Sequence, residues 1–245
     1  MGRRALPKIN PLLDLSRHLV ALESVACPWQ PGTLFGVEQP LEVEIGSGKG
    51  LFLATAAGRH PDRNFLGIEL GAKYARYAAA RLARAGLENG RVICGDAVRV
   101  FRELLPADSL VAVHVYFPDP WWKKRHRKRR VLHAEMLRTI ERSLLPGGRL
   151  HFWTDVEEYF RSTLQLVRVE TGLLGPFDVA AADPAHDLDY RTHFERRSRL
   201  AGIAVYRAEF QRVSVAAAAT REGTIGAAAD GTGSVGGSEF GQASP

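Results

Sequence analysis

The chain has 245 residues, 45% of them hydrophobic, which is enough to bury the core of one α/β domain. Its formal net charge of +6 is local, because residues 123–130 contain seven Lys or Arg and no acid, whereas the remainder has 26 basic and 27 acidic residues. The two cysteines, Cys27 and Cys94, exclude a disulfide framework and a zinc site and favour a reducing cytoplasm. No apolar run reaches membrane-spanning length.

The first clear element is a strand at residues 41–45 that runs into the glycine loop 46–50 and then into a helix that begins at Leu51. Residues 1–34 before it predict a lead segment with at most a short helix near Leu12–Leu22. Strand, glycine loop and helix open the doubly wound sheets that bind nucleotides. Leu51 stands where a dinucleotide-binding loop needs its third glycine, and no Walker A spacing is present, so a dehydrogenase and a P-loop enzyme are disfavoured.

The next strands are predicted at residues 64–69, 91–96 and 110–117. Each of the first four strands delivers a carboxylate at or near its carboxyl end, the edge where ligands bind in open α/β sheets. A carboxylate after the second strand can accept both ribose hydroxyls of a nucleoside. The one after the third strand can accept from an adenine amino group. The four acids are Glu44, Glu69, Asp96 and Asp119.

Residues 117–130 are the most distinctive stretch of the chain. Pro118 and Pro120 stop the fourth strand and hold Asp119 in a stiffened turn. Two tryptophans and then residues 123–130, which we call the basic strip, follow this turn. A fixed carboxylate beside aromatic rings and dense positive charge predicts a nucleic-acid substrate. The alternative is that the turn is only a turn and that the basic strip is a solvated helix face.

The rest of the chain predicts helices at residues 131–144 and 156–170, a fifth strand at 149–153 and a final strand at 203–213. A short strand is expected near residues 177–180, within a loop-rich stretch. From residue 216 the composition shifts to Ala, Gly, Ser and Thr, which cannot bury a core. We therefore expect a disordered tail over 214–245 and a folded domain over 35–213.

Several segments occur in an order that one family shares. They are Phe35-Gly36, Pro40-Leu41, Glu44-Ile45-Gly46 with Gly48 and Gly50, Gly67-Ile68-Glu69, Asp96, Phe117-Pro118-Asp119-Pro120-Trp121, Lys123-Lys124-Arg125-His126, Lys128-Arg129-Arg130, Thr154-Asp155, and Thr192 with Phe194-Glu195 and Arg197. In these segments the chain resembles bacterial tRNA (guanine-N7)-methyltransferases over about residues 35–212. The glycine loop is common to class I methyltransferases, whereas the segment 117–130 is much more specific.

The resemblance implies a Rossmann-like class I fold: a mostly parallel seven-stranded sheet with helices on both faces and an antiparallel last strand. It implies methylation of N7 of guanine 46 in the tRNA variable loop with S-adenosylmethionine as the donor, in the cytoplasm and without a metal. It also implies a site. Asp119 would be catalytic; Glu44, Gly46, Gly48, Glu69, Asp96 and Asp119 would bind the cofactor; Lys123, Asp155, Thr192, His193, Phe194 and Glu195 would bind the substrate; and Arg125, His126, Arg127, Lys128, Arg129 and Arg130 would contact RNA.

Three positions depart from the family pattern. Trp122 stands where the family often has a small residue or proline, His193 replaces a frequent lysine, and Ser198 replaces a common glycine. Trp121 or Trp122 is expected either to stack on an exposed base or to pack in the core.

Two other functions stay open at this point. Another class I methyltransferase could act on rRNA, DNA or protein, although Trp121 after Asp119-Pro120 counts against the amino-methylating Pro-Pro-Tyr/Phe type. A non-catalytic RNA-binding protein would be expected to have lost the cofactor acids or glycines, and these are intact. A monomer is favoured over a homodimer.

Overall fold

The computed structural model describes residues 6–25, 27, 29, 31–180 and 191–213. The described residues up to Arg212 form one compact unit. The predicted tail at 214–245 lies outside the described residues. No helix among the described residues is long and apolar enough to cross a membrane.

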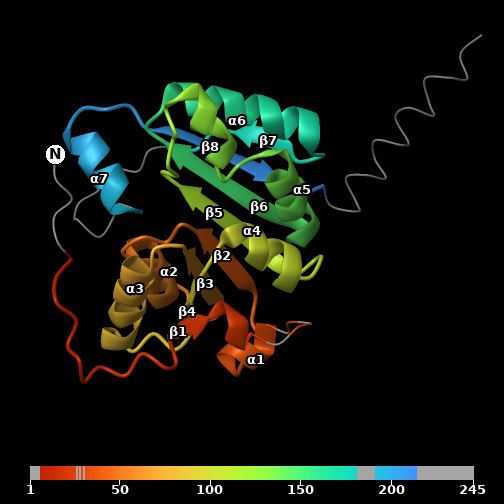
Figure 1. Ribbon diagram of the computed structural model, residues 1–245. Helices are drawn as coiled ribbons and strands as arrows, with labels where there is room; N and C mark the ends of the chain where they lie inside the picture. The colour runs from red at the N-terminus through yellow and green to blue at the C-terminus, as the bar shows by residue number, and fades with distance from the viewer. Residues whose placement is uncertain (1–5, 26, 28, 30, 181–190, 214–245) are drawn as a thin grey trace, which may run out of the picture. The chain divides into compact units, whose positions relative to one another are not determined.

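Eight strands form a single sheet in the described part of the chain (Figure 1). They are β1 (Leu19–Ala21), β2 (Leu41–Ile45), β3 (Asn64–Glu69), β4 (Gly90–Cys94), β5 (Leu110–Tyr116), β6 (Leu144–Thr154), β7 (Leu174–Phe177) and β8 (Tyr206–Gln211). Their order is β1-β4-β3-β2-β5-β6-β8-β7, and every neighbouring pair from β1 to β6 is parallel. β8 is antiparallel to both β6 and β7. The predicted mostly parallel sheet with an antiparallel last strand is confirmed, with one strand more than predicted.

The additional strand comes from the lead segment. Leu19 pairs with Val92 and Ala21 with Cys94, so β1 extends the sheet beyond β4. The short helix predicted near Leu12–Leu22 is therefore wrong. A three-residue strand is too short to show the period-2 alternation that identifies strands, and its pairing partner lies about 70 residues away in sequence.

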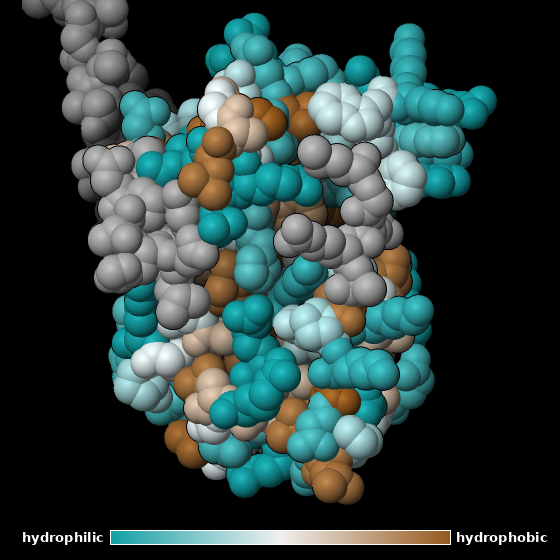
Figure 2. Space-filling view, turned by 90° about the vertical axis from the view of Figure 1, so that its left-hand side faces the viewer, coloured by the Kyte–Doolittle hydropathy of each residue, from teal (hydrophilic) through white to brown (hydrophobic). Residues whose placement is uncertain are grey.

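Helices cover both faces of the sheet (Figure 1). They are α1 (Pro31–Phe35), α2 (Leu51–Arg59), α3 (Ala72–Arg84), α4 (Ala97–Arg99), α5 (Ala134–Ser143), α6 (Glu157–Glu170) and α7 (His193–Leu200), with short turns η1 (Leu22–Ser24), η2 (Val100–Leu104, π-helical) and η3 (Lys124–Arg129, 3-10). The face of the molecule that carries α3 and α7 is largely hydrophilic, with only scattered apolar side chains (Figure 2).

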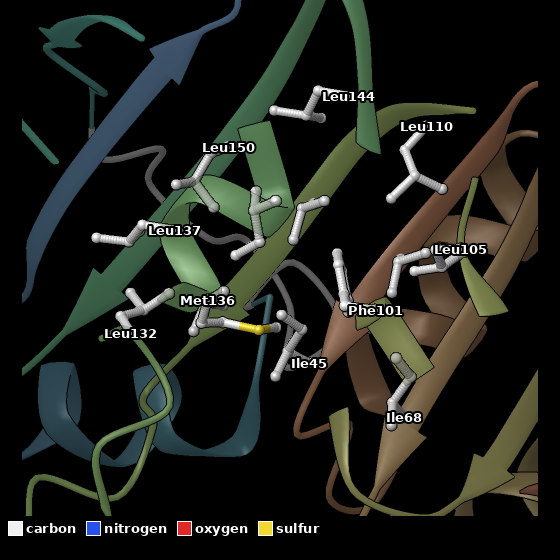
Figure 3. Packing of buried hydrophobic residues seen from close by; sticks show 14 of the residues in the cluster. Ile45, Ile68, Phe101, Leu105, Leu110, Leu132, Met136, Leu137, Leu144 and Leu150 are labelled. Atoms are coloured by element: carbon white, nitrogen blue, oxygen red, sulfur yellow. The ribbon is translucent and has the colours of Figure 1, made fainter. Parts of the chain in front are cut away.

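Two apolar clusters lie on opposite faces of the sheet. The larger one packs Ile45, Ile68 and Leu150 against η2 and α5 (Figure 3). The smaller one packs Phe65 and Val92 against the alanine-rich α2 and α3. Because successive strand residues point to opposite faces, β3, β4, β5 and β6 contribute to both clusters, whereas β2 contributes apolar residues only to the larger one. The sheet is therefore buried on both sides, and its carboxyl edge is left as the ligand-binding edge.

Candidate active site

The glycine loop between β2 and α2 is positioned by hydrogen bonds to the neighbouring strand. Gly46 N–H donates to the carbonyl of Ile68 at 2.8 Å, and Gly48 N–H donates to Oε2 of Glu69 at 2.8 Å. Gly50 has a φ of 66°, and a Cβ at this position would lie 2.7 Å from the Cβ of Ala78 in α3. Only glycine allows this turn and this close approach of the loop to α3.

Glu69 links the glycine loop to the start of α3. Its Oε1 accepts from Gly71 N–H at 2.8 Å, while its Oε2 accepts from Gly48. A carboxylate has about four lone-pair sites, so each oxygen can still accept one more hydrogen bond. Glu69 is therefore oriented by the backbone and retains acceptors for a ligand with paired hydroxyl groups.

Glu44, near the end of β2, is 4% exposed. Burial and the neighbouring charge of Glu69 raise the pKa of Glu44 to about 8. Its Oε2 and the hydroxyl of Ser47 are both buried without a hydrogen-bond partner in the described part of the chain. Buried polar atoms are nearly always satisfied, so these two atoms indicate that a polar ligand group completes the site.

The other two strand-end acids are exposed at the same edge of the sheet. Asp96 caps α4 by accepting from Val98 N–H at 2.9 Å. Asp119 follows Phe117, whose φ is 50°, and precedes Trp121, whose φ is 46°. Left-handed backbone is unfavourable for large side chains, so both ends of the Pro-Asp-Pro turn are strained. Strain of this kind collects at functional sites.

One residue of the basic strip is buried and does not face solvent with the others. Arg130, predicted to contact RNA, is 7% exposed. Its guanidinium donates to the carbonyl of Pro120 at 2.9 Å and to Glu158 at 2.6 Å, and it lies 4.3 Å from the ring centroid of Tyr159. Arg130 therefore fastens the Pro-Asp-Pro turn to α6.

The remainder of the basic strip faces solvent. Its exposed residues are Lys123, Lys124, Arg125, Arg127, Lys128 and Arg129, and His126 is half-buried. Arg127 pairs with Glu158 at 3.2 Å, and the guanidinium of Arg129 lies 5.1 Å from the ring centroid of Trp121. Trp122 is 69% exposed, so core packing is excluded for this residue.

Five of the six predicted substrate residues lie in α7, cap it or contact it, and Lys123 is the exception. Thr192 caps this helix by accepting from Glu195 N–H at 3.0 Å. Glu195 is 3% exposed, and its carboxylate accepts from Arg191 N–H at 2.7 Å and from Arg207 at 3.1 Å. The hydroxyl of Ser198 donates to Oδ2 of Asp155 at 3.0 Å. The first turn of α7 is thereby bonded to β8, and its last turn is bonded to the residue that follows β6.

Two further contacts join α7 to the rest of the edge. The rings of Phe194 and Phe117 lie 6.2 Å apart, so α7 is next to the Pro-Asp-Pro turn. Nη2 of Arg81 lies 3.4 Å from Nε2 of His193, which connects α7 to α3. Lys123 is exposed at the start of the basic strip.

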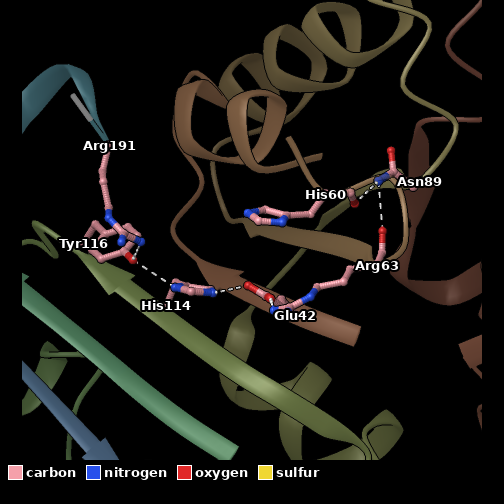
Figure 4. A network of polar contacts seen from close by, with 7 residues as sticks. All are labelled: Glu42, His60, Arg63, Asn89, His114, Tyr116 and Arg191. Carbon is pink, nitrogen blue, oxygen red and sulfur yellow. Dashed lines mark hydrogen bonds and ion pairs between the residues drawn. The ribbon is translucent and has the colours of Figure 1, made fainter. Parts of the chain in front are cut away.

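A chain of hydrogen-bonded side chains, which the sequence did not reveal, holds Arg191 just before α7 (Figure 4). Arg191 donates to the hydroxyl of Tyr116 at 3.0 Å, and this hydroxyl lies 2.9 Å from Nδ1 of His114. Nε2 of His114 lies 2.8 Å from Glu42, which also accepts from Arg63 at 2.6 Å. Burial opposes ionisation of Glu42, but the hydrogen bonds from His114 and Arg63 lower its pKa to about 2. The chain links Arg191 to the opposite edge of the sheet.

Arg191, at one end of this hydrogen-bonded chain, also lies among aromatic rings. The guanidinium of Arg191 lies 5.0, 5.9 and 6.0 Å from the ring centroids of Trp153, Tyr116 and Phe52. A cation over aromatic faces is stabilised electrostatically. Arg191 and Tyr116 are 75 positions apart, so no local pattern predicts their contact. The one signal in the sequence is that His114 and Tyr116 are polar residues at alternate positions of the otherwise apolar β5.

The parallel sheet, the glycine loop and the strand-end acids define a class I methyltransferase. A solved structure titled 16S rRNA methyltransferase KamB matches with a TM-score of 0.54 at 17% identity, covering 74% of this chain and 91% of that one, which supports the fold alone. No cluster of residues able to hold a metal ion occurs in the described ranges.

Sequence comparisons identify the family within the class I methyltransferases. A family model described as a putative methyltransferase matches residues 38–208. The tRNA (guanine-N(7)-)-methyltransferase of Rhodopirellula baltica is 49% identical over 87% of this chain and 81% of its own length. Those of Hydrogenovibrio crunogenus and Yersinia pseudotuberculosis are 38% and 36% identical, over 74% and 82% of this chain and 75% and 84% of their own lengths. The chain belongs to the tRNA (guanine-N7)-methyltransferase family.

Proposed function

We propose that this protein transfers the methyl group of S-adenosylmethionine to N7 of guanine 46 in the variable loop of tRNA, forming 7-methylguanosine. The observation that supports this most directly is the position of Asp119. It is exposed on a strained turn at the carboxyl edge of β5, fastened by Arg130 beside the exposed basic strip. The names of relatives up to 49% identical agree with this reaction.

The residues at the carboxyl edge fit S-adenosylmethionine, which supplies an electrophilic methyl group on a sulfonium when bound. Glu69 retains acceptors for ribose hydroxyls, and Gly46 and Gly48 let the backbone approach the ligand closely. Glu44 has an unpaired buried oxygen suited to a positively charged group. Asp96 is exposed at the same edge and completes the set.

Guanine N7 carries a lone pair and no proton, so no general base is needed to activate it. As the N7–CH₃ bond forms and the S–CH₃ bond breaks, the positive charge passes to the purine. Asp119 orients guanine by accepting from its N1–H and N2–H₂ edge and stabilises the developing charge. Asp119 therefore acts through orientation and electrostatics, without removing a proton.

The substrate subsite consists of Lys123, Asp155, Thr192, His193, Phe194 and Glu195. Asp155 and Phe194 have side chains at the edge that carries Asp119, as the Ser198 bond and the Phe117 contact indicate. Glu195 is buried, so it contributes by holding the turn that starts α7.

The exposed part of the basic strip binds the tRNA backbone. This surface consists of Arg125, His126, Arg127, Lys128 and Arg129. The buried Arg130 anchors it to α6 through its ion pair with Glu158. Trp122, which is exposed beside Lys123, stacks on an unpaired base. The methyltransferase domain spans residues 35–213, and the protein acts as a monomer in the cytoplasm, where its substrate is found.

The deciding experiment measures methyl transfer from labelled S-adenosylmethionine to an unmodified tRNA transcript and to one with guanine 46 replaced. Transfer to the first transcript alone supports the reaction, the substrate and the position. Transfer to both contradicts the position. Transfer to neither contradicts the proposed reaction, and loss of cofactor binding as well would favour the non-catalytic RNA-binding function.

A further inference from the structure

Helix α3 is a second concentration of positive charge in this chain. Its 13 residues include Lys73, Arg76, Arg81 and Arg84 and no acid. Outside the basic strip the chain is close to neutral, with 26 basic and 27 acidic residues. A helix with four cations and no anion is therefore exceptional in this protein.

One side of α3 is apolar and buried, and the opposite side carries three exposed cations. Ala75, Ala78 and Leu82 are buried against α2 and the sheet. Lys73, Arg76 and Arg84 are exposed, and we call them the α3 cationic face. From Lys73 to Arg84 the helix rises by about 16 Å, at 1.5 Å per residue. The ring of Tyr77 lies on the same side, 5.8 Å from the guanidinium of Arg84.

Among the described residues, no carboxylate forms an ion pair with Lys73, Arg76 or Arg84 of the α3 cationic face. Some exposed arginines on other helices are paired, for example Arg161 with Glu157 at 2.6 Å and Arg99 with Glu103 at 3.2 Å. Solvated helix faces usually mix the two signs of charge, so the absence of an acid along α3 indicates an anionic partner.

The helix is held firmly against the proposed active site. Gly50 and Ala78 make the close contact described above, and Nε of Arg81 donates to the carbonyl of Lys49 in the glycine loop at 3.0 Å. α3 begins just after Glu69, so Lys73 lies next to the ligand-binding edge and Arg84 lies three turns away from it. The side of the molecule that carries α3 presents hydrophilic side chains interspersed with apolar ones (Figure 2).

We propose that the α3 cationic face is a second RNA-binding surface, which contacts phosphates of the tRNA outside the variable loop. This inference rests on the proposed function. A nucleic-acid backbone presents regularly spaced negative charges to a row of cations about 16 Å long. A tRNA whose variable loop reaches Asp119 extends well beyond the basic strip, and α3 offers the next cationic surface that starts at the same edge.

The test compares two variants of equal charge change. One is Lys73→Glu/Arg76→Glu/Arg84→Glu, and the matched control is Arg102→Glu/Arg138→Glu/Arg168→Glu, which reverses three exposed arginines on η2, α5 and α6. We measure KM and kcat for full-length tRNA, the salt dependence of tRNA affinity, and binding of S-adenosylmethionine alone.

We expect the α3 variant to raise the KM for tRNA about tenfold or more beyond the control and to lower the salt slope of log affinity by about 2 to 3, one for each phosphate that is no longer neutralised. The kcat at saturating tRNA and the cofactor affinity should stay within about twofold. Lys73→Gln/Arg76→Gln/Arg84→Gln provides the same test without introducing acids and should give an intermediate increase in KM.

Equal KM and equal salt slope in the α3 variants and the control would overturn this inference while the parent still methylates tRNA. A parent protein that does not methylate tRNA would instead contradict the proposed function. A change in cofactor affinity in both α3 variants would also overturn it, since it would mean that the substitutions act through the glycine loop.

Discussion

The hydroxyl of Ser198 in α7 donates a 3.0 Å hydrogen bond to Oδ2 of Asp155 at the end of β6. Ser198 is 1% exposed, and it stands where the family resemblance implies a glycine, which could not make this bond. The bond orients the carboxylate of Asp155 through Oδ2, so that Oδ1 can contact the substrate in the proposed function. In this chain the proposed substrate carboxylate is therefore positioned by a residue that departs from the family pattern.

Replacing Ser198 by alanine should weaken tRNA use without unfolding the protein. Hydrogen bonds to charged groups contribute about 1.5–3 kcal/mol, so Ser198→Ala is expected to raise the KM for tRNA about tenfold. Steady-state kinetics measure this change. Ser143→Ala is the matched control, because Ser143 is equally buried but donates to the carbonyl of Thr139 inside α5. Equal KM values for the two variants would show that Ser198 does not position Asp155.

Tyr116→Phe should destabilise the protein, because it removes the hydroxyl shared by Arg191 and His114. A buried group left without its partner costs about 1–3 kcal/mol, which urea unfolding will detect. A double-mutant cycle with Arg191→Met isolates the contact between the two residues. Additive losses in the cycle would show that the hydrogen bond contributes nothing of its own.

Glu44 should make the stability of the ligand-free protein depend on pH. Its pKa rises from 4.5 in the unfolded chain to about 8 in the folded protein, so the folded state binds the proton more tightly. The stabilisation is fully present below pH 4.5 and is lost as the pH rises through 8.

Glu44→Gln removes this dependence. The variant should match the parent in stability near pH 4.5 and exceed it above pH 8, with a difference on the order of a few kcal/mol. Chemical unfolding at both pH values measures it. A constant difference across this range would contradict the assignment of the raised pKa to Glu44.

Substitutions at two residues of the basic strip should affect different properties, one the stability of the protein and the other its affinity for tRNA. Arg130→Ala breaks the buried contacts with Pro120 and Glu158, and we expect a loss of about 2 kcal/mol in the free energy of unfolding, since Glu158 itself is partly exposed. Lys128→Ala should leave the melting temperature unchanged and lower the salt slope of tRNA affinity by about 1. The reverse pattern would mean that the structural and RNA-binding roles are exchanged.

Asp119→Asn keeps the shape of the side chain and removes its charge. We expect the single-turnover rate of methyl transfer to fall about a hundredfold, as when a preorganised electrostatic group is removed from an active site. The rate should stay independent of pH across the neutral range, because no proton leaves guanine N7. An unchanged rate would exclude Asp119 as the catalytic residue.

The central strands were predictable because their apolar runs are bounded by glycine and charged residues. The predicted strands at 41–45 and 64–69 coincide with β2 and β3, and the strand-end acids follow from the same boundaries. The specific segment 117–130 was equally visible as local sequence. Local patterns therefore sufficed for the doubly wound core and for the place of the proposed catalytic residue.

Long-range polar contacts were not predictable from the sequence. The burial of Arg130 depends on Glu158, 28 residues later, and the role of Arg191 depends on Tyr116, 75 residues earlier. A charge block gives no indication of which member turns inward. β1 was missed for a related reason, since three residues carry no periodicity and acquire their conformation only by pairing with β4.

The polar chain from Arg63 to Arg191 has an evolutionary consequence. Each hydrogen-bonding side chain along it satisfies the next, so the loss of one leaves another buried and unpaired, whereas joint replacement by apolar residues can be neutral or stabilising. Positions 42, 114, 116 and 191 should therefore covary among relatives, being retained or replaced as a set while the strand-end acids stay fixed.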